Sequence, residues 1–314
     1  MRTCLTVIMI CCSLAVCAAE MKPVATMHLP CESTSQMVSP SGGQVAVRCK
    51  DRTLRLIDVK SGQEQHVFSA ADEVSSYNYS RDGQWFGAGM KDGWVEVVPA
   101  SGTAASKKWK ADDHRIDTVE FLSRGWILVA GADQPGGIWD IRDTPTLHAR
   151  LQSEFAGLTA CALSPDGKLL ATADGDTVVR VYDTATWKVA HEYRGFKLET
   201  FAVPFTSDGK YLLAGGANDH IAVLDPSSGT EVHRLGGEAG YVADILPLGD
   251  NHRVVVVYLD SDGTKPPRTV LWNLDTLKAE SITEEHPITG GGLVRGKLWI
   301  TSAAGSSLQA WEYE

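Results

Sequence analysis

The chain has 314 residues, of which 43% are hydrophobic and 22% are charged, a composition typical of a globular protein and unlike that of a disordered or collagen-like one. Lys and Arg number 29 against 39 Asp and Glu, which gives a formal net charge of −10, and the acids are spread along the chain. Because a phosphate backbone needs a concentrated basic face, nucleic acid is excluded as an expected partner.

The first residues have the order of a secretory leader. Arg2 precedes an apolar run over residues 4–16, and small residues follow at 17–19. A run of this length is shorter than the about 20 residues of a membrane-spanning helix, and the order of charge, apolar core and small residues is that of a signal peptide. We therefore predict a cleaved leader over 1–19, no transmembrane segment in the mature chain, and an exported protein, periplasmic or secreted. A lipoprotein attached through Cys17 is the alternative.

The rest of the chain repeats with one period. Turn glycines stand at Gly83, Gly125, Gly167 and Gly209, so that each step is 42 residues, as in 125 − 83. Each turn is followed by a bulky apolar pair and then by small residues such as Ala88-Gly89, where neighbouring sheets are expected to approach closely.

Apolar residues spaced by two precede each turn, as at Cys161 and Leu163, and this is the spacing of a β-strand. A second alternating segment follows, as over residues 176–183, then a tight turn and a fourth short strand. Four strands in about 42 residues, repeated, is the pattern of a propeller blade.

The repeats close on an aromatic or aliphatic residue followed by an acid or amide, as in Trp139-Asp140, Tyr182-Asp183 and Trp272-Asn273. Six residues ahead of the closing pair stands an acid in a tight turn, as at Asp133 and Asp176. In these features nearly all of the mature chain resembles a WD-repeat β-propeller, although the Gly-His pair that opens each unit of the family is absent. Quinoprotein-like, YVTN-type propellers are therefore neighbouring relatives.

This resemblance implies an all-β, seven-bladed propeller of four-stranded antiparallel blades. The segment Val24 to Leu29 is an extra strand, and the last repeat supplies only three strands. We therefore expect the N-terminal strand to pair with the C-terminal blade, which removes the open edges of an unclosed ring. Residues 20–314 are then one domain.

Local signatures of catalysis are missing from the sequence. It contains no Gly-x-Ser-x-Gly, no His-Glu-x-x-His and no Cys-x-x-Cys. Asp260-Ser261-Asp262-Gly263 matches only half of a calcium loop, and Cys161 is expected in the core as a buried thiol. We predict a protein that is not an enzyme and that has no cofactor and no metal.

Cys31 and Cys49 are a possible disulfide. Cys31 follows the N-terminal strand and Cys49 ends the second strand of the first repeat, and in a propeller these two connections emerge on one face. Spacing alone does not fix the separation of their Cα atoms.

Two sets of loops converge on one rim of such a propeller, those from the fourth to the first strand and those from the second to the third. Their residues mix acids with a few aromatic and cationic groups, as in a recognition surface. The candidate binding residues on this rim are Asp92, Asp112, Asp113, His114, Arg115, Asp133, Asp174, Arg194, Phe196, Lys197, Asn218, Asp219, His220 and Tyr241.

Two functions follow as hypotheses. The first is a non-enzymatic interaction platform that binds a protein or peptide through this rim. The second is a small-molecule or metal binder, or a hydrolase, that uses the axial mouth of the ring as lactonase-like or quinoprotein-like propellers do. The second needs several acids converging on one ion, and no pattern in the sequence indicates such convergence.

Overall fold

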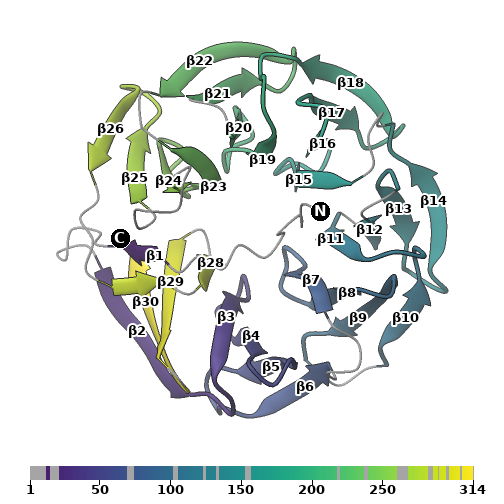
Figure 1. Ribbon diagram of the computed structural model, residues 1–314, viewed down its shortest axis with the longest axis vertical. Coiled ribbons are helices and arrows are strands. Elements are labelled where there is room, and N and C mark those ends of the chain that lie inside the picture. Colours follow the sequence, from purple (N-terminus) through teal and green to yellow (C-terminus); the bar gives the residue numbers. More distant parts are fainter. Residues whose placement is uncertain are drawn as a thin grey trace. The chain divides into compact units, whose positions relative to one another are not determined.

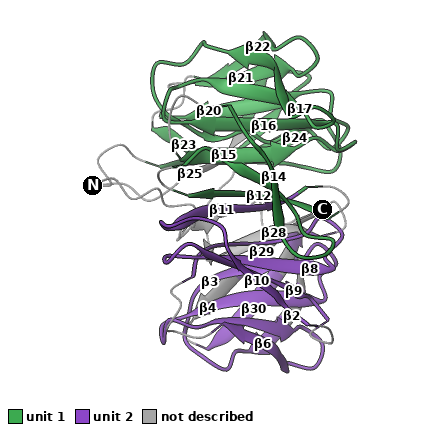
Figure 2. Cartoon of the chain, turned by 90° about the vertical axis from the view of Figure 1, so that its right-hand side faces the viewer, with its two compact units in different colours: residues 1–6, 122–282 green, residues 7–121, 283–314 purple. Residues whose placement is uncertain are grey.

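A computed structural model describes residues 12–14, 21–68, 74–101, 105–122, 125–131, 134–152, 157–217, 220–236, 240–259, 268–281, 286–288, 290–294, 297–304 and 306–313. Within these ranges every regular element is a β-strand (Figure 1). The chain forms two compact units: unit 1 is Met1–Thr6 with Leu122–Ile282, and unit 2 is Val7–Phe121 with Thr283–Glu314 (Figure 2).

Unit 2 contains the first two blades and the blade that closes the ring. The first blade is β3 (Ser33–Val38), β4 (Gln44–Cys49), β5 (Leu54–Asp58) and β6 (Glu64–Phe68). The second is β7 (Val74–Tyr79), β8 (Trp85–Met90), β9 (Trp94–Pro99) and β10 (Lys107–Lys110). The closing blade is β28 (Gly290–Val294), β29 (Lys297–Ala304), β30 (Ser307–Tyr313) and β2 (Met21–His28).

The third blade is the sheet β11 (Ile116–Phe121), β12 (Trp126–Gly131), β13 (Gly137–Asp140) and β14 (Thr146–Arg150). Unit 1 continues with β15 (Leu158–Leu163), β16 (Leu169–Asp174), β17 (Val179–Asp183) and β18 (Lys188–Tyr193). The fifth blade is β19 (Thr200–Ala202), β20 (Leu212–Gly216), β21 (His220–Asp225) and β22 (Thr230–Gly236). The sixth is β23 (Tyr241–Pro247), β24 (Arg253–Leu259), β25 (Arg268–Asn273) and β26 (Lys278–Ser281).

The predicted fold is confirmed: the chain is an all-β, seven-bladed propeller of four-stranded antiparallel blades. Ring closure is by β2, which pairs antiparallel with β30 from Met21 opposite Tyr313 to His28 opposite Ser307. A short parallel contact between β28 and β3 also joins the closing blade to the first, so that these two blades form one eight-stranded sheet. That contact was not foreseen.

Small residues sit where blades approach one another, as predicted. In unit 2 a Cβ atom added at Gly89 of β8 would lie 2.4 Å from Ile116 Cγ2 of β11, and one at Gly87 would lie 2.9 Å from Val119 Cγ1. Real Cβ atoms do not approach this closely, so glycine allows β11 to pack on β8. Phe86, whose side chain is fully buried, fills the space on the other face of the same strand.

A disulfide joins Cys31, in the connection from β2 to β3, with Cys49 at the end of β4, and the two Cα atoms are 5.8 Å apart. The Lys50 backbone N–H also donates to the Glu32 carbonyl over 2.9 Å. The strand that closes the ring is thereby attached covalently to the first blade.

Several further predictions have different outcomes. Cys161 is not part of a disulfide and is half-buried against the core of unit 1, not fully buried as expected. Within the predicted leader the structure describes only Cys12–Leu14, which forms β1 and pairs with β27 (His286–Ile288). The half calcium loop at 260–263 lies outside the described residues. A single domain over 20–314 stays a prediction.

Candidate functional site

The predicted rim residues of unit 1 stand at strand ends that share one edge of their blades. Asp174 ends β16, Arg194 follows β18, His220 begins β21 and Tyr241 begins β23. Because successive strands within a blade are antiparallel, the end of a second or fourth strand lies at the same edge as the start of a first or third. These four residues therefore lie at one edge of their blades, and their role in binding stays a prediction.

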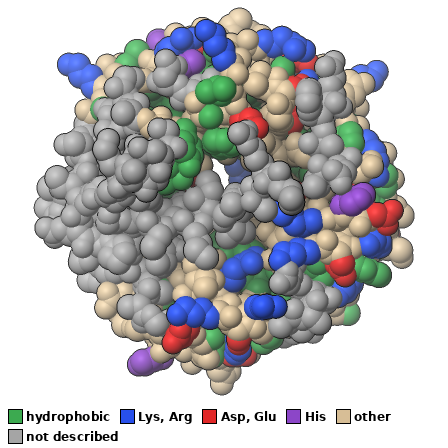
Figure 3. Space-filling model, in the orientation of Figure 1, with side chains coloured by type: hydrophobic (Ala, Val, Ile, Leu, Met, Phe, Trp, Pro, Cys, Tyr) green, Lys and Arg blue, Asp and Glu red, His purple; other side chains and the backbone are tan. Residues whose placement is uncertain are grey.

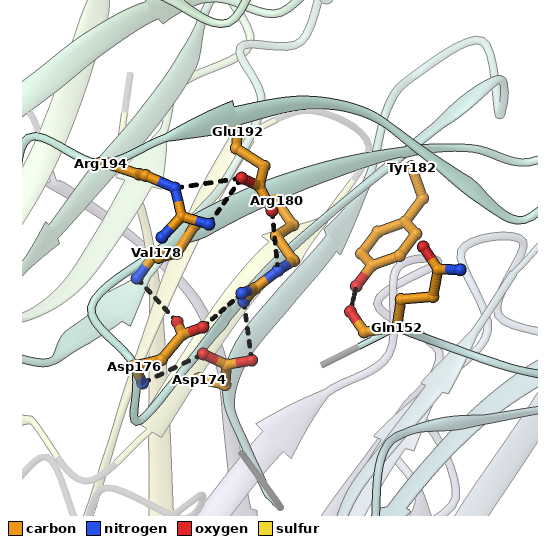
Figure 4. Close-up of polar contacts among 8 residues, drawn as sticks. All are labelled: Gln152, Asp174, Asp176, Val178, Arg180, Tyr182, Glu192 and Arg194. Carbon is orange, nitrogen blue, oxygen red and sulfur yellow. Dashed lines mark hydrogen bonds and ion pairs between the residues drawn. The ribbon is translucent and has the colours of Figure 1, made fainter. Parts of the chain in front are cut away.

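Beneath this rim lies a buried ion network (Figure 4). Arg180 of β17 directs its guanidinium at two carboxylates, with Nη1 3.0 Å from Asp174 Oδ2 and Nη2 bonded to Asp176 Oδ2. Arg180 Nε lies 3.4 Å from Glu192 Oε1. The side chains of Arg180 and Asp174 are only 4% and 1% exposed, so Asp174 supports the rim from below and is not itself a surface group.

The network keeps Asp176 and Arg180 charged. Burial opposes ionisation of Asp176, but hydrogen bonds from Arg180 and with Asp174 outweigh it and lower the pKa of Asp176 to about 2. Burial also opposes the charge of Arg180, and its bonds to the two aspartates raise its pKa above the ordinary value instead. A fully paired cluster of this kind is rigid, because each charge satisfies another.

The network reaches the surface through Glu192. Arg194 is 61% exposed, and its Nη2 lies 2.8 Å from Glu192 Oε2, the carboxylate that also contacts Arg180 (Figure 4). The cationic end of Arg194 is therefore held at the start of the loop between β18 and β19 by the same cluster that fixes the turn between β16 and β17.

The loop between β18 and β19 combines a buried anchor with exposed groups. Phe196 is 5% exposed, and its ring centroid lies 5.3 Å from that of Tyr193 and 5.2 Å from that of His220. Lys197 is exposed, and Leu198 is 54% exposed, more than any other large hydrophobic side chain among the residues described. The anchored loop thus presents an apolar side chain beside a cation.

The end of that loop is fixed by the fifth blade. The Ala217 backbone N–H donates to the Glu199 carbonyl over 2.8 Å, and a Cβ atom at Gly216 would lie only 2.2 Å from that carbonyl oxygen. Tyr241, half-buried, packs edge-on to Phe201, with ring centroids 6.0 Å apart.

The predicted rim residues of unit 2 are Asp92, Asp112, Asp113, His114 and Arg115. Asp112 Oδ1 accepts the His114 backbone N–H over 2.9 Å, and Arg115 Nε donates to the buried Asp117 over 2.5 Å. Asp92, Asp113 and His114 are exposed. In the space-filling view, Lys and Arg side chains gather over β3, β4 and β7 of this unit (Figure 3).

Three predicted rim residues, Asp133, Asn218 and Asp219, lie outside the described residues. Sequence reasoning missed Arg180, Glu192 and Leu198. Arg180 could have been noticed in the sequence, because it is a charged residue between two valines, Val179 and Val181. Leu198 carried none, since a single leucine in a loop is ordinary.

No group of three or more His, Cys, Asp or Glu side chains in the described part of the chain is arranged to hold a metal ion. In the Asp174–Asp176 pair, both carboxylates face the Arg180 guanidinium. The described residues also include no helix with the length and apolar character needed to cross a bilayer.

The comparisons with known proteins agree with this geometry. The sequence profile of the WD domain, G-beta repeat, matches residues 146–183, which run from β14 to the end of β17. The chain is a β-propeller that matches the WD repeat over these residues. A chain in the crystal structure of the mitotic checkpoint complex superimposes with a TM-score of 0.77 at 16% identity, covering 93% of this chain and 92% of that one.

Curated relatives match over part of their length. Protein groucho of Drosophila melanogaster is 30% identical over 152 residues, which are 46% of this chain and 20% of groucho. The U3 small nucleolar RNA-associated protein 15 homologues of Xenopus laevis and Xenopus tropicalis are 28% and 24% identical, over 60% and 57% of this chain. The matches cover 34% and 37% of those two proteins.

WD-repeat propellers generally bind protein partners, and this coarse function is the one that the profile and the relatives support. The WD-repeat profile and the relatives named above agree with the prediction that the protein is not an enzyme.

The predicted export is wrong. Two of the relatives are named for association with a small nucleolar RNA, which is a component of the cell interior, and the relatives point to an intracellular rather than an exported protein. The periplasmic, secreted and lipoprotein alternatives are all overturned by this finding. Three residues of the apolar run over 4–16 form strand β1, which pairs with β27.

Proposed function

We propose that the protein is a non-enzymatic interaction platform and that the rim of unit 1 binds a peptide segment of a partner protein. One observation carries the proposal: the loop between β18 and β19 is anchored by buried Phe196 while it holds Leu198 54% exposed. An apolar side chain on a fixed loop loses little conformational entropy on binding, and its burial removes apolar area from water.

The charge of the loop indicates the chemistry of the partner. Arg194 and Lys197 flank the anchored Phe196, and both are exposed. A peptide with an apolar residue near one or more acids would cover Leu198 and face these two cations. Charged groups at such a rim act mainly on the rate and selectivity of association.

The experiment places a photo-crosslinking amino acid at position 198 of the full chain, with the same amino acid at position 232 as the matched control. Val232 is also exposed, at 41%, but lies on the outer strand β22. We expect a discrete protein adduct from position 198 in extracts of the source cells, with the crosslink mapped to the loop, and none from position 232.

Charge reversal provides the second arm. Lys197→Glu should reduce the adduct at position 198 by about tenfold if an acidic segment is bound, a change that corresponds to one lost charge-assisted contact. Equal adducts from positions 198 and 232 would contradict the proposed binding surface. An adduct that Lys197→Glu leaves unchanged would contradict the proposed acidic character of the partner.

A further inference from the structure

A hollow of about 160 Å³ lies in unit 1 at the opposite strand ends from the rim. Trp126 begins β12, and residues 184–187 are the turn between β17 and β18. The hollow is lined by Leu122, Trp126, His148, Leu163, Thr184, Ala185 and Trp187.

Three aromatic rings form the wall. The Trp126 ring centroid lies 4.5 Å from that of His148, edge to face, and 6.4 Å from that of Trp187 at an interplanar angle of 58°. His148 is exposed and Trp187 is half-buried, so the wall opens to the surface. Such rings favour a further ring in an edge-to-face or offset arrangement.

His148 reaches the hollow through a β-bulge. Between β13 and β14, Ile138 pairs with Ala149 while Trp139 pairs with Leu147, which leaves His148 as the extra residue. The fourth and fifth blades have a bulge at the same place, where the extra residues are Ala190 and Val232. A bulge re-aims a side chain, and of these three blades only the third places an aromatic ring there.

Trp187 departs from the repeat as well. It has a φ of +56° and donates its N–H to the Asp183 carbonyl over 2.7 Å. Gly62 and Gly229 make the same bond to Asp58 and Asp225, with φ of +69° and +71°. A left-handed backbone is natural for glycine and strained for a bulky side chain, so this turn holds an indole at a position where two other blades have none.

Two cations near the hollow are paired with acids, and the carboxylate of Asp183, which precedes the lining turn, accepts the N–H groups of Ala185 and Thr186. Arg142 stacks on Trp126 with 5.3 Å from its Cζ to the ring centroid, and its Nε lies 3.0 Å from Asp140 Oδ1. Lys168, whose carbonyl accepts the Thr184 N–H, has its Nζ 3.4 Å from Asp166. The surroundings therefore match an uncharged occupant rather than an ion.

The volume restricts the size of that occupant. Sites for drug-sized molecules have about 300–1,000 Å³, whereas an enclosed apolar cavity of about 150 Å³ in another protein accommodates benzene. The present hollow has a similar volume but is open to solvent on one side and carries polar groups on Thr184 and His148. We propose that the hollow is a second binding site, which takes one phenyl-sized side chain, Phe or Tyr, from a segment of a partner protein. This site is separate from the rim and does not depend on the proposed function.

The test is a fluorine NMR titration of the full chain with the peptide acetyl-Gly-Ser-(4-fluoro-Phe)-Ser-Gly-amide. We expect a saturable shift with a dissociation constant on the order of 1 mM, as for a single buried ring. The unlabelled Phe peptide should compete, and the same peptide with Ala in place of Phe should not. Trp187→Gly should weaken binding by about tenfold or more.

Matched variants distinguish an effect on binding in the hollow from an effect on folding. Leu277→Gly changes another bulky residue with a left-handed backbone, φ +54° in the turn between β25 and β26, and should leave binding unchanged. Ala185→Leu should block the hollow, whereas Ser227→Leu, at the same position of the turn between β21 and β22, should not. Both residues donate their N–H to the aspartate two positions earlier.

The proposal is overturned by any of three results: no saturable shift with the wild-type chain up to about 10 mM peptide, wild-type binding by both Trp187→Gly and Ala185→Leu, or equal losses from Leu277→Gly. Leu198→Ser on the rim should leave this titration unchanged. Failure of the rim proposal and failure of this one are thereby distinguishable.

Discussion

Arg180 and Asp174 form an ion pair in unit 1 with 3.0 Å between Nη1 and Oδ2, and their side chains are 4% and 1% exposed. Asp176 completes the cluster from the neighbouring turn. A buried cation that satisfies two carboxylates cannot be removed without leaving both of them unpaired in a medium of low dielectric constant.

Arg180→Leu should therefore lower the free energy of unfolding by about 3–5 kcal/mol. Urea denaturation followed by circular dichroism would measure the change. Arg194→Leu is the control, because its exposed pair with Glu192 should contribute no more than about 1 kcal/mol. If the two variants lower the free energy of unfolding by similar amounts, the buried network contributes no more to stability than the exposed pair does.

Glu120 of β11 gives a pH dependence of known sign. Burial raises its pKa to about 7, against the lowering effect of the hydrogen bond from Asn78 Nδ2 at 2.5 Å. The ordinary value is 4.5, so between pH 4.5 and 7 the folded protein binds protons that the unfolded chain has released. The unfolding free energy should fall as the pH rises through this window.

Glu120→Gln keeps a partner for Asn78 and removes the titration. The variant should lose part of the slope and be more stable than the wild type at pH 8 by about 1–2 kcal/mol. Melting temperatures between pH 4.5 and 8 would test this. Some slope should persist, because burial also raises the pKa of Asp244 to about 6. An unchanged slope in the variant would exclude Glu120 as a source.

Alanine variants at Gly93 and Gly62 distinguish the cost of backbone strain from the cost of steric overlap. Both have a positive φ, +84° and +69°, but a Cβ atom at Gly93 would lie 2.0 Å from the Asp112 carbonyl oxygen, while one at Gly62 meets nothing within 4 Å. Gly62→Ala should cost about 1 kcal/mol of unfolding free energy. Gly93→Ala should cost clearly more in the same denaturation assay, and equal costs would contradict the close packing.

The Cys31–Cys49 disulfide closes a loop with a sequence separation of 18. Replacing both cysteines with serine should lower the unfolding free energy by about 2–4 kcal/mol through a less constrained unfolded chain. A reducing agent should bring the wild type to the stability of the variant and leave the variant unchanged. If reduction has no effect on the wild type, the bond does not contribute to stability.

Much of the fold follows from the sequence because the blade repeats. A 42-residue step forces equivalent residues into equivalent strands, as in the hydrogen bond from Asn78 to Glu120, which are 42 positions apart. The closing strand followed from counting strands. The parallel contact of β28 with β3 did not, since it depends on how two blades meet and not on any local pattern.

The rim was predictable as a set of loop ends, but its chemistry was not. Asp174 and Phe196 were expected at the surface and are buried, because a partner for each comes from a residue elsewhere in the chain, Arg180 for one and His220 for the other. The leader was inferred from the order of a cation, a short apolar run and small residues, and that order does not fix the compartment of the folded protein.

Closure by β2 has a consequence for the order of synthesis. The side chains of Gln36 and Thr301, hydrogen-bonded in unit 2, are 265 positions apart, and β2 cannot pair until β30 has left the ribosome. Contacts of such long range form slowly. We therefore expect the nascent chain to carry its first blade for most of translation while the edge of β2 has no partner strand.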